Sequence, residues 1–332
     1  MFKLKKNYSV LGFSLGFFFL SSLSFINAIN LKHDLNSLVD SVKETSSQFT
    51  VNSEGVLVKY TGDDKEVIIP QNVKSIGFGA FMEHSEIEKI ILPNDLEVID
   101  EYAFYSCTSL KEIIIPDKVN RIGRLAFGDC SKCTRIHLGT SVKTIEEFVF
   151  WGCTSLENIE VNENNANYSS YQGLLYNKNM SDLKVCPAGK TGIINLPESV
   201  IVISGYAFFD CNNIEEIHRP GDKLIKLEVA AFYGCSKLKS IDFENNIKKI
   251  GACAFSECKS MKEFTVGEYV KSLGSSAFIE CKSLKKVIFK SKNVELGHDL
   301  FARCPKNIVI IADKDSSAAI YAKRHSDKLV LV

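Results

Sequence analysis

The chain has 332 residues and carries 40 basic and 40 acidic side chains, so its formal net charge is zero. This balance gives no reason to expect a nucleic-acid-binding protein, because phosphates favour a concentrated basic patch, and no such patch is visible in the sequence. The length would suggest two globular domains, unless structural repeats stack in one dimension to make a single elongated domain.

Residues 1–28 have the pattern of a secretory signal peptide. Lys3, Lys5 and Lys6 precede an uncharged run over residues 7–30, and Ala28 offers a small residue for cleavage. An uncleaved anchor is the alternative, because the apolar stretch 10–26 is near the lower limit for a helix that spans a bilayer. The serines in that stretch favour the signal peptide. We therefore expect a secreted or cell-surface protein, which contacts the membrane only if this segment stays attached.

Residues 29–72 are predicted to cap the N-terminal end of the fold. The apolar residues within 31–42 follow helical spacing, which indicates a short amphipathic helix. Residues 55–70 then read as two strands around a turn at Gly62 and Asp63. We interpret this segment as a helix and a hairpin that cover the first repeat.

A pattern of the form IGxxAFxxCxxLxxIxI occurs nine times between residues 73 and 312. The intervals between its phenylalanines are 23 or 24 residues, except for one of 58. A period in the range of 20 to 29 is typical of a leucine-rich-repeat solenoid, in which each turn buries its apolar side chains only by stacking on its neighbours. The phenylalanines are Phe81, Phe104, Phe127, Phe150, Phe208, Phe232, Phe255, Phe278 and Phe301.

Each repeat contains a predicted strand. In the second repeat, Leu110 and Ile113 point one way while Glu112 and Ile114 point the other, which is the period-two alternation of a strand. Stacked turns should align these strands into one parallel sheet on one face of the solenoid. The apolar residue five positions before each phenylalanine, such as Ile76, forms a second ladder. The fold class is therefore a solenoid of mostly short strands and turns.

Two segments interrupt or end the repeats. Residues 162–199, within the interval of 58 residues, have the order strand, polar turn, strand and proline, and we interpret them as a hairpin island that restarts the stack. Residues 313–332 should close the C-terminal end, because Ser316 or Ser317 can cap a helix that runs to His325 and the last residues, LVLV, read as a strand.

Most of the eleven cysteines are predicted to be buried and reduced rather than paired. Equivalent positions in adjacent turns lie about 4.8 Å apart with parallel side chains, which does not suit a disulfide. Cys130 and Cys133 form a CxxC motif, but Cys133 stands at a leucine position and no second pair completes a zinc site, so we expect no metal. His84 takes the cysteine's place in the first repeat. The eight cysteines that follow a phenylalanine by three residues are Cys107, Cys130, Cys153, Cys211, Cys235, Cys258, Cys281 and Cys304.

Catalytic chemistry is not expected. The sequence contains no HExxH, its one GxSxG match, at residues 12–16, lies inside the apolar run of the predicted signal peptide, and the turn geometry identifies no histidine beside a cysteine nucleophile. We therefore assign no catalytic residues and no cofactor.

The outward row of the predicted sheet is the candidate binding surface. Its residues vary from turn to turn while the buried ladders do not, as expected if packing fixes the scaffold and the face is free to suit a ligand. A merely solvated sheet face is the alternative. The residues near the centre of this row are Arg135, His137, Glu160, Glu216, His218 and Asp242.

The repeats VKSIGFGAFMEHSEIEKIILP and VNRIGRLAFGDCSKCTRIHLG resemble the BspA-like leucine-rich repeats, also called the Treponema pallidum type. The likeness covers about 240 residues, from 73 to 312. Arg219 departs from the pattern, because it stands in an apolar ladder and puts the packing of its strand in doubt. The resemblance implies secreted or surface proteins of bacteria and some parasitic protists that bind host matrix proteins or neighbouring cells, and it implies no catalytic residues.

The resulting functional hypothesis is an exported adhesin or surface antigen. Its partner should be a protein or glycan on host matrix or on neighbouring cells, bound through the exposed sheet face. A structural scaffold of the cell envelope, which self-associates and has no host ligand, is the alternative.

Overall fold

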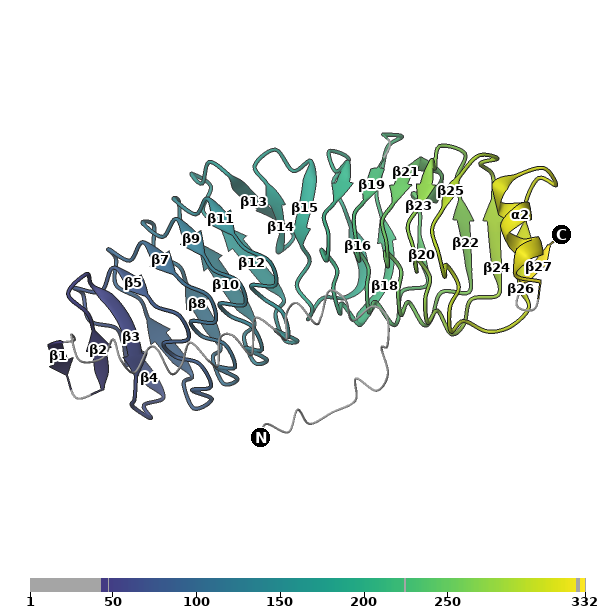
Figure 1. Ribbon diagram of the computed structural model, residues 1–332. Helices are drawn as coiled ribbons and strands as arrows, with labels where there is room; N and C mark the ends of the chain where they lie inside the picture. The colour runs from purple at the N-terminus through teal and green to yellow at the C-terminus, as the bar shows by residue number, and fades with distance from the viewer. Residues whose placement is uncertain (1–42, 47, 224, 327–328, 332) are drawn as a thin grey trace.

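The part of the chain that the structure describes is an elongated solenoid of parallel strands with almost no helix (Figure 1). The computed structural model describes residues 43–46, 48–223, 225–326 and 329–331. The solenoid has about twelve turns rather than the nine counted from the phenylalanines. The three additional turns were missed because they have no phenylalanine at the repeated position. Tyr60 takes that position in the first turn, Cys186 takes it in the island, and a helix closes the last turn.

Each turn contributes two short strands, which we call the ladder strand and the face strand. In the turns that carry a phenylalanine, the ladder strand contains the apolar residue five positions before it, such as Ile76, and the face strand contains residues such as Ile90. The expected apolar ladder is thus itself a sheet, because consecutive ladder strands pair in parallel register. The face strands do not form the single sheet that was predicted, but four separately paired segments.

The ladder strands form two sheets. The first contains β1 (Lys43–Ser46), β2 (Phe49–Val51), β3 (Val56–Tyr60), β5 (Ser75–Ile76), β7 (Val98–Ile99), β9 (Arg121–Ile122) and β11 (Thr144–Ile145). The second contains β13 (Tyr168–Tyr171), β14 (Leu174–Asn177), β15 (Asp182–Val185), β17 (Val202–Ile203), β19 (Ile225–Leu227), β21 (Ile247–Ile250), β23 (Ser272–Leu273) and β25 (Glu295–Leu296).

The face strands form the four segments. These are β4 (Glu66–Ile68) with β6 (Lys89–Ile91); β8 (Glu112–Ile114), β10 (Arg135–Leu138) and β12 (Asn158–Val161); β16 (Thr191–Asn195), β18 (Asn213–His218) and β20 (Ser240–Ile241); and β22 (Glu263–Val266), β24 (Lys286–Phe289), β26 (Ile308–Ile311) and β27 (Leu329–Leu331). Among the described residues, one 3-10 turn, η2 (Glu244–Asn246), follows β20.

The predicted hairpin over residues 55–70 is wrong in its pairing. Both strands exist, as β3 and β4, but they belong to different sheets and pair with β5 and β6 of the next turn. They are the ladder and face strands of the first solenoid turn. The antiparallel hairpin at this end is formed by β2 and β3 instead. The helix expected over residues 31–42 lies outside the described residues.

The island restarts the stack as predicted. β14 pairs antiparallel with both β13 and β15, and β15 then pairs in parallel with β17 of the next repeat. The buried residues accordingly divide into two hydrophobic cores, one on each side of the island. Figure 1 shows β13, β14 and β15 between the two runs of ladder strands.

The C-terminal cap is also as predicted. Helix α2 (Ser317–Arg324) begins after Ser316, whose Oγ accepts a hydrogen bond of 3.1 Å from the backbone N–H of Ala319. The final strand, β27, pairs in parallel with β26. Together they cover the last turn, which would otherwise expose apolar side chains to water.

The phenylalanines form two stacked columns within the solenoid. Neighbouring rings are nearly parallel, with 5.3 Å between the centroids of Phe104 and Phe127 and 5.4 Å between those of Phe255 and Phe278. Cys186 interrupts the column between Phe150 and Phe208, because it occupies the phenylalanine position of the island turn.

The cysteine column has a hydrogen-bonding role that the sequence did not reveal. All eleven cysteines are free thiols, and the thiol of Cys130, for example, donates to the backbone oxygen of Phe104 in the preceding turn at 3.3 Å. His84, which replaces the first cysteine, places its Nε2 3.1 Å from the backbone oxygen of Tyr60. A small buried donor is therefore what this position requires, and histidine can supply it at the end of the column.

Candidate surface for ligand binding

Three of the six predicted site residues form one ion-pair cluster on neighbouring face strands. Arg135 and His137 lie on β10, and Glu160 lies on β12. The Oε1 atom of Glu160 is 3.6 Å from Nε of Arg135, and its Oε2 atom is 3.1 Å from Nδ1 of His137. All three side chains are partly exposed, so the cluster presents both charges to a ligand.

The other three residues lie beyond the island. On β18, His218 Nε2 and Glu216 Oε2 are 3.1 Å apart. Asp242 is exposed, and its Oδ1 accepts a hydrogen bond of 2.9 Å from the backbone N–H of Arg219. Asp242 thus has a structural partner of its own.

The predicted row is not continuous, because the island hairpin lies beside β12. The N–H of Ile159 donates to the backbone oxygen of Gly173 at 2.9 Å, and the N–H of Val161 donates to Ser170 Oγ at 3.0 Å. Strands β12 and β16 consequently belong to different segments of the face. The structure brings together Arg135, His137 and Glu160, and separately Glu216 and His218.

Arg219 does not disrupt the packing of its turn. Its side chain is buried, with Nε donating to the backbone oxygen of Val200 at 2.8 Å and Nη2 donating to that of Glu198 at 3.2 Å. Burial lowers the pKa of the guanidinium. The carbonyl groups replace water as hydrogen-bond acceptors, so the charged residue is tolerated in the apolar ladder.

An exposed apolar surface adjoins the Arg135 cluster and was not assigned to the site from sequence. Ile68, Ile91 and Ile114 lie on β4, β6 and β8 with exposed fractions of 65%, 43% and 63%. Ile68 is the strand partner of Ile91, and Ile114 is the partner of His137. We call these three residues the isoleucine stripe. The signal for it is an isoleucine at the outward position of the strand in the segments VIIP (67–70), IILP (90–93) and IIIP (113–116).

A shallow groove connects the stripe to the charged cluster. It is lined by the end of the stripe, by two of the three cluster residues and by the loops that follow the face strands. The lining residues include Ile114, Pro116, Asp117, His137, Glu160 and Asn162. Such a groove offers apolar contact at one end and charged hydrogen-bonding groups at the other.

Within the part of the chain that the structure describes, no group of three His, Cys, Asp or Glu side chains is arranged to hold a metal ion. Cys133, of the CxxC motif, is buried, and its Sγ lies 3.5 Å from the backbone oxygen of Arg135. No helix among the described residues is both long enough and apolar enough to cross a bilayer.

Comparison with known proteins identifies the repeat. The family model for the BspA type leucine rich repeat region matches residues 59–185 and 188–308. No protein in the comparison with curated sequences matches the chain. Among solved structures, the chain is similar to the pneumococcal vaccine antigen PcpA, with 22% identity, a TM-score of 0.63, and coverage of 81% of this chain and 79% of PcpA. It is also similar to a leucine-rich repeat protein from Eubacterium ventriosum, with 19% identity, a TM-score of 0.52, and coverage of 79% and 94%.

Proposed function

Because the chain belongs to the BspA-type leucine-rich-repeat family, we propose that it is an exported binding protein, an adhesin or surface antigen, that acts through the face strands. The similarity of its fold to the antigen PcpA supports a role at the cell surface. The lysine-rich start and apolar run of residues 1–28 support export.

The isoleucine stripe is the observation on which the binding surface rests. Large apolar side chains exposed at the same position of three successive turns are unfavourable in water, and such patches commonly mark interaction sites. The Arg135 cluster at the end of the stripe would fix the orientation of a partner through charged hydrogen bonds. The partner that suits both features is a protein of the host matrix. Glu216, His218 and Asp242 lie beyond the island and would contribute only to a ligand that extends past it.

Binding to immobilised collagen, laminin and fibronectin tests the proposal. The triple variant Ile68→Thr, Ile91→Thr and Ile114→Thr should lose most of the retention that the parent has on its matrix protein. Since these side chains are exposed, its melting temperature should stay close to that of the parent. A matched control variant replaces three residues with threonine and should bind like the parent. These residues, which are exposed on face strands of the C-terminal half, are Ile193, Ile311 and Val330. Undiminished binding by the stripe variant would contradict the proposal.

A self-assembling envelope scaffold is the competing function. It requires an oligomer whose size grows with concentration and a parent protein that none of the matrix proteins retains. Sedimentation velocity over a range of concentrations distinguishes the two. A monomer that binds matrix protein supports the adhesin.

A further inference from the structure

Four lysines line a second groove, on the ladder sheet of the C-terminal half rather than on the face strands. Lys226 lies on β19, Lys248 and Lys249 lie on β21, and Lys271 directly precedes β23. Lys226 is the strand partner of Lys249, and the N–H of Lys271 donates to the backbone oxygen of Lys248. All four side chains are exposed. We call these residues the lysine cluster.

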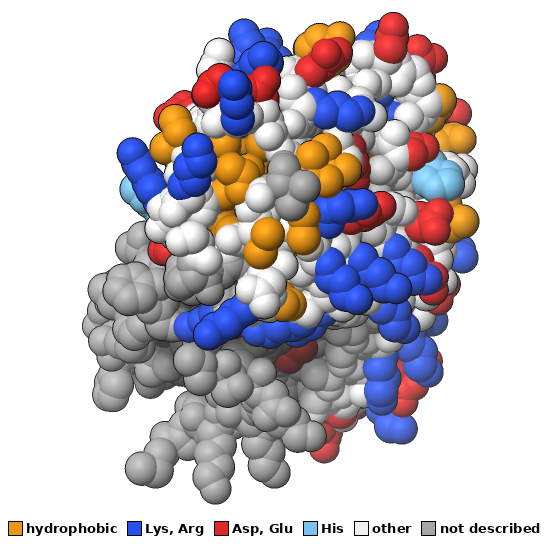
Figure 2. All heavy atoms as spheres, turned by 90° about the vertical axis from the view of Figure 1, so that its right-hand side faces the viewer, with side chains coloured by type: hydrophobic (Ala, Val, Ile, Leu, Met, Phe, Trp, Pro, Cys, Tyr) orange, Lys and Arg blue, Asp and Glu red, His pale blue; other side chains and the backbone are white. Residues whose placement is uncertain are grey.

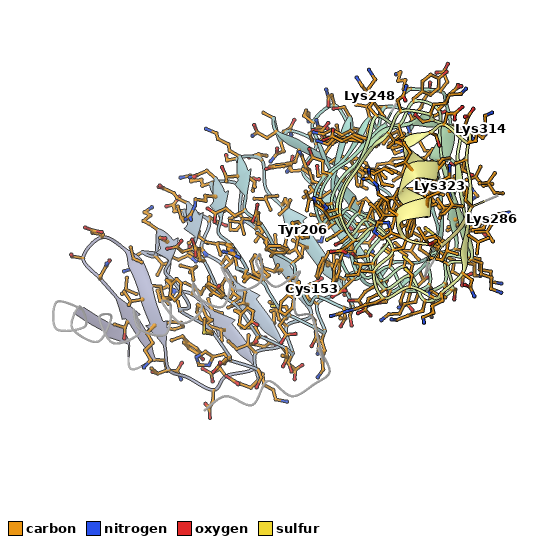
Figure 3. The ribbon with its side chains drawn as sticks, turned by 45° about the vertical axis from the view of Figure 1, so that its right-hand side comes forward. Cys153, Tyr206, Lys248, Lys286, Lys314 and Lys323 are labelled. Carbon is orange, nitrogen blue, oxygen red and sulfur yellow. The ribbon has the colours of Figure 1, made fainter. Side chains whose placement is uncertain are left out.

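The cluster and the face strands lie on different sides of the solenoid. In Figure 3, Lys248 projects from the upper side of the C-terminal half, whereas Lys286, which lies on face strand β24, projects from another side. Seen from the C-terminal end, basic side chains gather in several separate groups on the surface (Figure 2). A ligand of the lysine cluster would therefore leave the isoleucine stripe free.

The positive charge of the cluster is largely uncompensated. Only Lys226 has an acidic partner, with 2.8 Å between its Nζ and Oε1 of Glu228. Among the described residues, Lys248, Lys249 and Lys271 make no ion pair. Because like charges repel, three unpaired ammonium groups around one groove lower the stability of the fold unless an anion binds there.

At the equivalent ladder positions of the N-terminal half, the described residues form no such group of unpaired cations. Arg121 on β9 contacts both Asp100 and Glu146, at 2.9 and 2.8 Å. Lys74, which precedes β5, lies 3.4 Å from Asp95. Lys143, which precedes β11, makes no ion pair among the described residues, but its neighbour Arg121 on β9 is paired, so no group of adjacent unpaired cations forms there and the repeat itself does not require the cluster.

The shape of the lysine cluster suits a linear polymer more than a membrane surface or a nucleic-acid duplex. It spans three adjacent ladder strands, which at about 4.8 Å per strand is on the order of 10 Å. Acidic residues bound it, with Asp182 on β15 and Glu295 on β25. An anionic bilayer would meet these acids as well as the lysines, and the cluster is too narrow to follow the backbone of a nucleic acid. A linear polymer with a carboxylate or sulfate on each sugar could cross the strands between the acids.

We propose that the lysine cluster binds a linear polyanionic glycan, a polysaccharide that carries sulfate or carboxylate groups. Lysine ammonium groups on flexible stems bind anions as point charges and impose little geometry. Affinity should therefore depend on charge density and fall steeply with salt concentration. The site was not evident from the sequence because its lysines come from three successive turns and acidic residues elsewhere balance their charge.

Heparin serves as the test ligand, and two triple variants of equal charge are compared. The cluster variant is Lys248→Gln, Lys249→Gln and Lys271→Gln. The control variant is Lys111→Gln, Lys118→Gln and Lys292→Gln, which removes three lysines that each contact a carboxylate. At about 0.1 M NaCl we expect the cluster variant to bind heparin about tenfold or more weakly than the parent, with a shallower salt dependence. The control should bind like the parent.

Three outcomes would overturn the proposal. The first is equal heparin affinity of the parent and the cluster variant. The second is equal weakening in both triple variants, which would mean that only net charge matters. The third is tighter binding of the parent to duplex DNA or to vesicles of anionic phospholipid than to heparin at the same salt concentration. Circular dichroism melting of both variants establishes that a loss of binding does not come from unfolding.

Discussion

Leu174 and Leu175 are adjacent residues of one strand, β14, yet they pack in different hydrophobic cores. Leu174 belongs to the core of the C-terminal half, and Leu175 belongs to the core of the N-terminal half. Both are fully buried. Because successive side chains of a strand point to opposite sides, β14 separates the two cores and contributes side chains to both.

This arrangement predicts that the two leucines control the stability of different halves. Leu174→Ala and Leu175→Ala should each lower the free energy of unfolding by about 2–5 kcal/mol, through lost burial and the cavity left behind. In hydrogen exchange, Leu175→Ala should speed exchange mainly in the ladder strands before the island, and Leu174→Ala mainly in those after it. Equal acceleration of both halves by either variant would mean that the two cores unfold as one unit.

Asp210 predicts a dependence of stability on pH. Burial and, to a smaller extent, the negative charge of Glu257 together raise the pKa of its carboxyl group to about 6 from an ordinary value near 3.8. The folded state therefore binds more protons than the unfolded state between about pH 4 and pH 6, so stability falls as pH rises through that window. Asp210→Asn should be more stable than the parent by about 1–3 kcal/mol at pH 8. Below about pH 4 the difference should disappear.

Urea denaturation at pH 3.5 and at pH 8 measures this effect. Glu54→Gln, which removes an exposed carboxylate, is the control and should leave the difference between the two pH values unchanged. Burial raises the pKa of Glu244 to about 7, so some loss of stability with rising pH should remain in the Asp210 variant. An Asp210→Asn protein no more stable than the parent at pH 8 would show that the carboxyl group is hydrated in the fold.

The cysteines should be reduced in the native protein and largely unreactive. Nine of the eleven are buried, and only Cys253 and Cys304 are partly exposed. Burial raises the pKa of the Cys107 thiol, which disfavours the reactive thiolate. A thiol reagent should therefore modify at most two cysteines quickly before unfolding and all eleven in denaturant without a reductant. Cys253→Ser should lower the fast count by one, and disulfide-linked peptides would contradict the prediction.

The features that could be predicted from the sequence are those that depend on the repeat period or on residues close together in the chain. The period of the phenylalanines gave the fold class, and Ser316 marked the start of α2 because a helix N-terminus needs a side-chain acceptor. It undercounted the turns, since Tyr60 and Cys186 fill the phenylalanine position without resembling it. Which strands pair depends on neighbours one turn away, so β3 and β4 were wrongly joined.

The candidate site was predicted less completely for the same reason. Alternation along a strand indicates that Arg135 and Glu160 point outward, but it does not reveal that the island separates them from Glu216. The isoleucine stripe and the lysine cluster arise only when residues about 23 positions apart come to lie on successive turns of the solenoid. Surface chemistry in a solenoid is therefore a property of the stack and is not visible in any one repeat.

The repeated turn predicts an unusual response to glycine. Each phenylalanine has a residue in the left-handed conformation two positions before it and another two positions after it. Around Phe278 these residues are Ser276, with φ of 57°, and Glu280, with φ of 62°. Most of these positions are not glycine, although a side chain there costs about 1–2 kcal/mol.

Ser276→Gly should therefore leave the free energy of unfolding unchanged or raise it by up to about 1 kcal/mol, because glycine adopts positive φ without a steric penalty. The control is Lys132→Gly, at an exposed position that is not left-handed, which should lower stability by about 0.5–1 kcal/mol. Urea denaturation of both variants measures the contrast. Equal destabilisation by the two substitutions would mean that contacts of the Ser276 side chain, and not its backbone conformation, decide which residue is favoured there.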